Sequence, residues 1–142
     1  MVTTLLAALC LMSLCVVTHA VGVASALGHV RSRTEIGLRF WRDIWLLIVL
    51  ASWIIVLHLV EICVWAGFYV ATSAMPDLPS ALYFSAVTYT TTGYGDLVLP
   101  REWRLVGGVE ALTGILMCGW STGFFVAVVS RFHQPQSRAI NA

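Results

Sequence analysis

The segment TYTTTGYGDL, residues 88–97, interrupts a chain that otherwise consists mostly of leucine, valine, alanine and tryptophan. Within ten residues it brings together four threonines, two glycines and an aspartate. Threonine supplies hydroxyl groups, and glycine permits a backbone with positive φ that other residues resist. The fold follows from what surrounds this polar interruption.

Length and composition indicate a membrane protein. Of the 142 residues, 59% are hydrophobic and 11% are charged, and the mean hydropathy is +0.88. A soluble domain normally carries about 25% charged residues, so this chain has too little polar surface to cover a water-soluble globule. The net charge of +1 gives no electrostatic reason to expect nucleic-acid binding. The sequence shows no Cys-x-x-Cys pair, clustered histidines or nucleophile–base pairing, so it predicts neither a resident metal site nor an enzyme.

Three long apolar segments predict three transmembrane helices, at residues 1–30, 44–71 and 103–131. Each exceeds the ~20 residues that a helix needs to cross a bilayer. The first segment lacks the basic start of a signal peptide, so we expect it to be retained as a helix. The predicted fold class is therefore an all-α membrane protein.

A shorter apolar segment, residues 79–90, lies between the second and third spans and is too short to cross the membrane. Pro79 suits the first turn of a helix, and either Asp77 or Ser80 is suited to cap it. A short helix followed by a polar, glycine-rich return at residues 91–96 is typical of a re-entrant loop. Backbone of this kind is tolerated at membrane depth only where it is buried in protein or lines a water-filled cavity.

Arginines predict the orientation of the chain in the cell membrane. The linker 31–43 carries four arginines, and Arg131 and Arg138 lie at the end of the third span and in the tail 132–142. Basic segments favour the cytoplasmic side, so the N-terminus is expected outside and the C-terminus inside. The arginines of the linker do not recur at every third position of an apolar helix, which argues against a voltage sensor.

The polar segment is suited to binding a cation inside the membrane. A cation that leaves water needs oxygen atoms in place of its hydration shell, and consecutive backbone carbonyls that point the same way supply them. Gly93 and Gly95 alternate with Thr92 and Tyr94, which suits such a strand, and Thr91 adds a hydroxyl group. The preceding short helix directs its negative C-terminal end towards the same region.

The sequence ALYFSAVTYTTTGYGD, residues 81–96, resembles the pore helix and selectivity filter of potassium channels. The pattern Thr-x-Thr-Thr-x-Gly-Tyr-Gly-Asp is matched throughout, and the similarity covers the outer helix, loop and inner helix of residues 44–131. The resemblance implies a homotetramer in the lipid bilayer that conducts K⁺ passively, with K⁺ as the permeant ion and no cofactor. It assigns K⁺ to Thr91, Thr92, Gly93 and Tyr94, adds Gly95 to the filter, and assigns the outer mouth to Asp96.

Residues behind the filter depart from the family pattern. Phe84 replaces a tryptophan that is common there, and Val87 stands where some bacterial channels have glutamate. We expect Tyr83 or Tyr89 to brace the filter instead. We also expect Glu110, in the third span, to hydrogen-bond the pore helix or filter from behind. Tyr83, Phe84, Val87 and Glu110 are therefore the predicted supports of the filter.

Other predictions concern the inner helix and the polar groups of the spans. The resemblance implies an inner helix that bends at a glycine and closes at an apolar constriction. The hinge candidates are Gly114, Gly119 and Gly123, and the gate candidates are Phe124, Phe125 and Val128. His58 and Glu61 are three residues apart on one helix face, so they are placed to pair. His19 is expected to be a satisfied polar group at a helix contact.

The function predicted from these residues is potassium-selective conduction. Two alternatives stay open: a non-selective cation channel of the same fold, and a non-conducting membrane subunit. The stimulus that opens the pore and the role of the first span are not indicated by the sequence.

Overall fold

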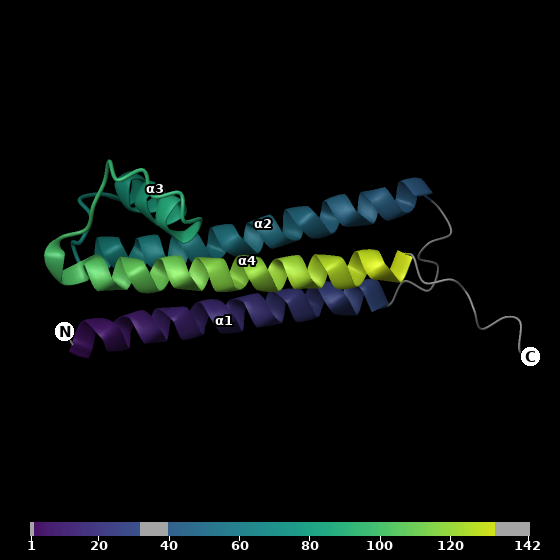
Figure 1. The fold of residues 1–142 in the computed structure, drawn as a ribbon, viewed down its shortest axis with the longest axis horizontal. Coiled ribbons are helices and arrows are strands. Elements are labelled where there is room, and N and C mark those ends of the chain that lie inside the picture. Colours follow the sequence, from purple (N-terminus) through teal and green to yellow (C-terminus); the bar gives the residue numbers. More distant parts are fainter. Residues whose placement is uncertain (1, 32–39, 133–142) are drawn as a thin grey trace, which may run out of the picture.

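The computed structural model describes residues 2–31 and 40–132, all of whose regular elements are helical (Figure 1). In chain order the elements are α1 (Val2–Arg31), α2 (Phe40–Ala71), α3 (Leu78–Tyr89), a 3-10 turn (Arg101–Trp103) and α4 (Arg104–Phe132). The predicted all-α fold class is confirmed. Most of the expected linker 31–43 and nearly all of the tail 132–142 lie outside the described residues.

α1, α2 and α4 are each long and apolar enough to cross a membrane, as the three apolar segments predicted. They contain 30, 32 and 29 residues. At 1.5 Å per residue these helices are about 43–48 Å long, which exceeds the ~30 Å hydrocarbon core. α2 begins at Phe40, earlier than the expected residue 44, and Asp43 in its first turn interacts favourably with the positive end of the helix dipole.

α3 is the short helix expected between the second and third spans. Asp77 caps its N-terminus, because the backbone N–H of Ser80 donates a 2.8 Å hydrogen bond to Asp77 Oδ1. Backbone and side-chain hydrogen bonding at Ser80 lowers the pKa of the Asp77 carboxyl. Pro79 lies in the first turn, where a missing N–H breaks no helical hydrogen bond. Of the two predicted caps, Asp77 is therefore the correct one.

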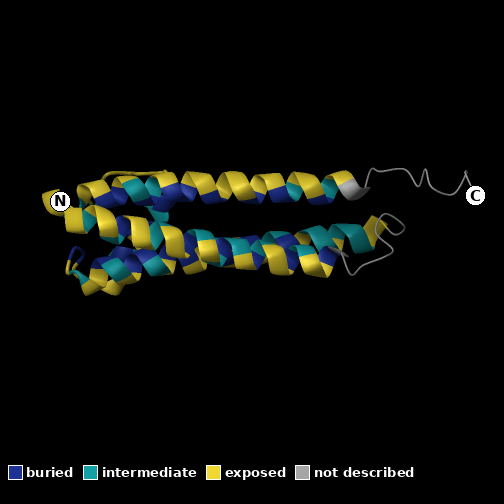
Figure 2. Ribbon diagram, turned by 90° about the horizontal axis from the view of Figure 1, so that it is seen from below, coloured by how far each residue is buried: buried dark blue, intermediate teal, exposed yellow. Residues whose placement is uncertain are grey.

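The three long helices pack side by side, with α1 and α3 on opposite sides of the α2–α4 pair (Figure 1). Buried residues line the faces that the helices turn towards one another, and exposed residues cover the outside (Figure 2). The exposed side chains include many large apolar ones, such as Trp53, Ile55 and Leu112. Apolar residues on all sides of a helix are typical of a membrane span.

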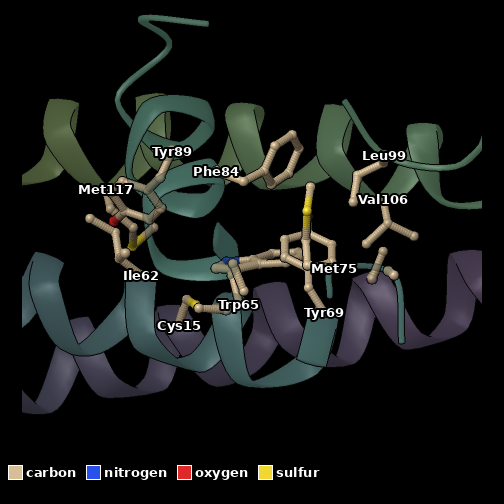
Figure 3. Packing of buried hydrophobic residues seen from close by; sticks show 14 residues of the cluster. Cys15, Ile62, Trp65, Tyr69, Met75, Phe84, Tyr89, Leu99, Val106 and Met117 are labelled. Carbon is tan, nitrogen blue, oxygen red and sulfur yellow. The ribbon is translucent and has the colours of Figure 1, made fainter. Parts of the chain in front are cut away.

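The buried apolar residues form two clusters along the bundle. The larger one lies beside α3 and centres on aromatic residues of α2 and α3: Trp65, Tyr69, Phe84 and Tyr89 (Figure 3). The smaller one joins α1, α2 and α4 near the opposite end: Ala26, Val30, Leu50, Ile54, Phe124 and Val128. The larger cluster therefore fixes α3, and with it the start of the polar segment, against the long helices.

Candidate functional site

The polar segment after α3 has an alternating backbone. Thr91, Gly93 and Gly95 have φ values of +59°, +52° and +78°, whereas Thr92 and Tyr94 are not in the positive-φ region. Alternating signs of φ turn successive carbonyl groups towards the same side of a strand. The glycine positions were predicted to need this conformation, but Thr91 was not. A β-branched residue rarely has positive φ, so residue type gave no signal there.

The inner end of this segment is tied to the last turn of α3 by backbone hydrogen bonds. The N–H of Thr91 donates to the carbonyl of Thr88 at 2.9 Å, and the N–H of Gly93 donates to the carbonyl of Val87 at 3.0 Å. Val87 therefore supports the segment through its backbone carbonyl. A backbone contact of this kind does not depend on the side chain at position 87, where some bacterial channels have glutamate.

A side-chain contact lies at the other end of the segment. The Tyr83 hydroxyl donates a 2.7 Å hydrogen bond to Asp96 Oδ2. This bond lowers the pKa of the exposed Asp96 carboxyl. Of the two tyrosines considered as braces, Tyr83 reaches the segment. Tyr89 instead directs its hydroxyl towards Glu61 in α2.

Most side chains of residues 90–96 are uncovered within one chain. Tyr94 is 72% exposed. Phe84 does not cover it, because its ring packs edge-on against Tyr69, with the ring centroids 5.3 Å apart (Figure 3). A surface of this kind is suited to contacts with further copies of the chain.

Glu110 lies behind α3 and is fully buried. The Tyr69 hydroxyl donates to Glu110 Oε2 at 2.6 Å, and Ser85 Oγ contacts Glu110 Oε1. Ser85 Oγ also lies 3.0 Å from the carbonyl oxygen of Ile62, which only accepts. One hydroxyl hydrogen cannot serve both oxygens, so both contacts are hydrogen bonds only when Glu110 is protonated and donates to Ser85. The expected link from Glu110 to the pore helix is thus made through Ser85.

Polar side chains from all four helices meet in a second buried group, the His19 cluster: His19, His58, Glu61, Tyr89 and Ser121. His19 Nδ1 lies 2.9 Å from Glu61 Oε1, and Tyr89 contacts Glu61 Oε2. His58 Nδ1 lies 3.0 Å from the Tyr89 hydroxyl. Ser121 Oγ lies 3.1 Å from the Nε2 atoms of both His19 and His58. His58 and Glu61 lie close together, as predicted, with His58 Nδ1 3.8 Å from Glu61 Oε2.

The hinge and gate candidates of α4 differ in their surroundings. A Cβ atom added at Gly114 would lie 1.9 Å from the carbonyl oxygen of Tyr89, whereas Gly119 and Gly123 have nothing within 4 Å of that position. Gly114 is therefore the point at which α4 touches the end of α3.

Among the gate candidates, Phe124 and Val128 are buried in the smaller cluster. They pack against α1 and α2, whereas Phe125 is only partly buried. Phe125 is thus the most accessible of the three gate candidates.

Comparison with known proteins links this geometry to a family. The family model described as ion channel matches residues 44–131. The potassium voltage-gated channel protein shk-1 of Caenorhabditis elegans is 34% identical over 79 residues, which are 51% of this chain and 15% of the relative. The potassium voltage-gated channel protein Shal of Drosophila melanogaster is 36% identical over 64 residues, 44% of this chain and 11% of the relative. The chain thus spans well under a fifth of the length of either relative. No solved structure matches it significantly.

Proposed function

This chain belongs to the ion channel family, whose model covers residues 44–131, and on that premise we propose that four copies form a potassium-selective channel. Membership places the chain among channels rather than enzymes. Its three candidate spans make it a multi-pass membrane protein. In the proposed channel K⁺ moves passively down its electrochemical gradient.

The observation that carries the proposal is the alternating backbone of residues 91–95. Alternating φ supports a row of carbonyl oxygens that face one side, which is what a dehydrated cation requires. The proposed K⁺ ligands are Thr91, Thr92, Gly93, Tyr94 and Gly95. The Gly-Tyr-Gly at the centre of this row, together with the names of the two relatives as potassium channels, favours K⁺ over Na⁺.

Fourfold assembly follows from the need to surround the ion. One chain contributes one strand, and a closed ring requires symmetric copies. The exposure of Tyr94 supports a partner at this position. α4 also has an exposed apolar stripe next to its uncovered glycines, which is suited to a neighbouring subunit or to the pore: Leu112, Ile115, Leu116 and Val126.

Asp96 is the proposed outer mouth of the pore. Its carboxylate is exposed, and the Tyr83 hydrogen bond lowers its pKa. Four such carboxylates around an axis raise the local cation concentration. This assignment requires the α3 end of the bundle, and the N-terminus with it, to face the outside of the cell.

Ion flux from the purified full-length chain in liposomes tests the proposal. We expect K⁺ flux, and a reversal potential in mixed K⁺ and Na⁺ that follows the K⁺ gradient. Gly93→Ala should abolish the flux, because alanine resists the positive φ at this position. Gly28→Ala, in α1 and outside the proposed pore unit, is the matched control, since a Cβ atom there meets nothing within 4 Å.

Each outcome decides between the alternatives. Equal permeability to K⁺ and Na⁺ would overturn selectivity in favour of the non-selective channel. A stable assembly without any flux would identify a non-conducting subunit. Flux that survives in Gly93→Ala would show that the ion takes another path.

A further inference from the structure

We propose that His19, His58 and Glu61 form a binding site for a divalent transition-metal ion of the Zn²⁺ type. The site lies within the helix bundle and is separate from the proposed filter. No motif in the sequence signals this site, because its ligands belong to two helices and His19 is 42 residues from Glu61. It is the fold that brings imidazole nitrogens from α1 and α2 to one carboxylate.

The ligand atoms have the spacing that a small metal ion needs. His19 Nδ1 lies 2.9 Å from Glu61 Oε1, and His58 Nδ1 lies 3.8 Å from Glu61 Oε2. One ligand atom from each of the three residues lies within 4.8 Å of the others. Zn²⁺ bonds of about 2.0–2.1 Å place neighbouring ligands of a tetrahedron about 3.3 Å apart. The two observed separations bracket this value but run to different oxygens of Glu61, so the carboxylate must turn slightly to present an oxygen to an ion held by both nitrogens.

The ligand set selects the class of metal. Two imidazoles and one carboxylate are typical zinc ligands, and imidazole also suits copper, nickel and iron. Calcium and magnesium prefer sites built from oxygen atoms. K⁺, the proposed permeant ion, binds carbonyl oxygens. The site is therefore distinct in chemistry from the filter as well as in position.

Surrounding groups already have the arrangement of an outer shell. A histidine that binds metal through Nδ1 carries a hydrogen on Nε2, which needs an acceptor. Both Nε2 atoms lie 3.1 Å from Ser121 Oγ, which is able to accept both hydrogens. The Tyr89 hydroxyl contacts Glu61 Oε2 and so orients the carboxylate. Metal binding would thereby link α1 and α2 directly, and α3 and α4 through Tyr89 and Ser121.

Burial and charge suit a metal ion held inside the helix bundle. His19 and Glu61 are fully buried, and His58 is 18% exposed. The Glu61 carboxylate offsets one of the two positive charges of the ion, which lowers the cost of placing it in a medium of low dielectric. The three side chains leave the fourth tetrahedral position to water or another oxygen, as in zinc sites with three protein ligands.

Metal analysis of the untagged full-length chain tests this proposal. The chain is produced in medium supplemented with Zn²⁺ or Co²⁺ and purified in detergent, and the metal is quantified by mass spectrometry. We expect one ion per chain, and visible absorption bands of tetrahedral Co²⁺ in the Co²⁺ form. His19→Gln and His58→Gln should each remove the metal and the bands. His29→Gln, a histidine on the same helix as His19 but outside the cluster, should retain both.

A further variant separates metal binding from hydrogen bonding alone. Ser121→Ala keeps all three ligands, and the loss of an outer-shell partner should weaken metal affinity about 10–100-fold. The proposal would be overturned if the unmodified chain carried no metal and gave no Co²⁺ bands. It would also be overturned if both His19→Gln and His58→Gln kept one metal ion per chain. These measurements do not involve K⁺ flux, so they stand whatever the flux experiment shows.

Discussion

Thr91 has φ of +59°, a conformation that β-branched side chains rarely adopt. Its neighbours contribute to the local structure, because the hydroxyls of Thr90 and Thr92 lie 3.0 Å apart and Thr90 also donates to the carbonyl of Ala86. Unfavourable backbone conformations persist where the surrounding structure holds them, and they are concentrated at functional sites. The position of Thr91 at the start of the proposed filter fits this pattern.

The Tyr83–Asp96 hydrogen bond predicts how the proposed channel responds to external pH. The bond lowers the pKa of Asp96, so the carboxylate persists above that lowered pKa and is lost as pH falls through it. Tyr83→Phe removes the donor and should move the pKa of Asp96 back towards 3.8. We expect the fall in K⁺ current on external acidification to occur at higher pH in this variant. Current–pH curves measure the shift, and Asp96→Asn is the control that should lack the step.

The contacts of Glu110 predict that a glutamine side chain can take the place of this glutamate without breaking them. A protonated Glu110 accepts from Tyr69 and donates to Ser85, and a glutamine side chain does both. Glu110→Gln should therefore change the free energy of unfolding by less than about 1 kcal/mol. Glu110→Ala leaves the buried Tyr69 hydroxyl without its acceptor, while Ser85 keeps the carbonyl of Ile62, and should cost about 1–3 kcal/mol. Thermal melting in detergent compares the two variants, and equal losses would show that Glu110 is ionised.

At the scale of elements, the contact between α3 and α4 depends on Gly114. A Cβ atom would overlap the carbonyl of Tyr89, which is backbone and cannot rotate away. Gly114→Ala should therefore displace α3 and destabilise the protein by at least about 1–3 kcal/mol, the usual cost of overpacking. Gly119→Ala, on the same helix with nothing within 4 Å, should be neutral or slightly stabilising. Melting temperatures of the two variants measure the difference, and similar values would refute the packing role.

α1 is attached to the other helices by specific contacts as well as by apolar packing. His19 joins Glu61 of α2 and Ser121 of α4, and the Trp53 side chain donates a 3.1 Å hydrogen bond to the carbonyl of Gly22. Through Glu61 the same network reaches Tyr89, the last residue of α3. The first span therefore supports the end of the helix from which the proposed filter starts.

At the scale of the whole molecule, the proposed orientation can be read from the accessibility of the two ends. The positive-inside rule and the assignment of Asp96 to the outer mouth both require an external N-terminus. A membrane-impermeant maleimide should label Thr3→Cys in intact cells and Ser137→Cys only after permeabilisation. The parent chain is the background control, because its four cysteines lie in the apolar helices. The reverse labelling pattern would show that the N-terminus lies inside the cell.

Much of the fold was predictable from the sequence because each element carries a local signal. Length and hydropathy identify the three spans, and Asp77 with Pro79 identifies the start of α3. The alternation of Gly93 and Gly95 indicates the special backbone of the polar segment. The His19 cluster was missed because no local pattern joins residues on four helices. The available signal was that His19, Glu61 and Ser121 are polar residues within apolar helices.

The class of the protein followed from the sequence. Its composition has too little polar surface for a soluble globule, which indicates a membrane protein, and residues 88–97 match a filter pattern residue by residue. Tertiary structure alone decided which supports that segment has: Tyr83 at Asp96, Ser85 at Glu110, and the polar cluster around His19. The two kinds of information differ in the distance along the chain over which they act. Hydropathy, capping and glycine conformation depend on neighbouring residues, whereas these contacts join side chains that are distant in sequence and meet only when the helices pack.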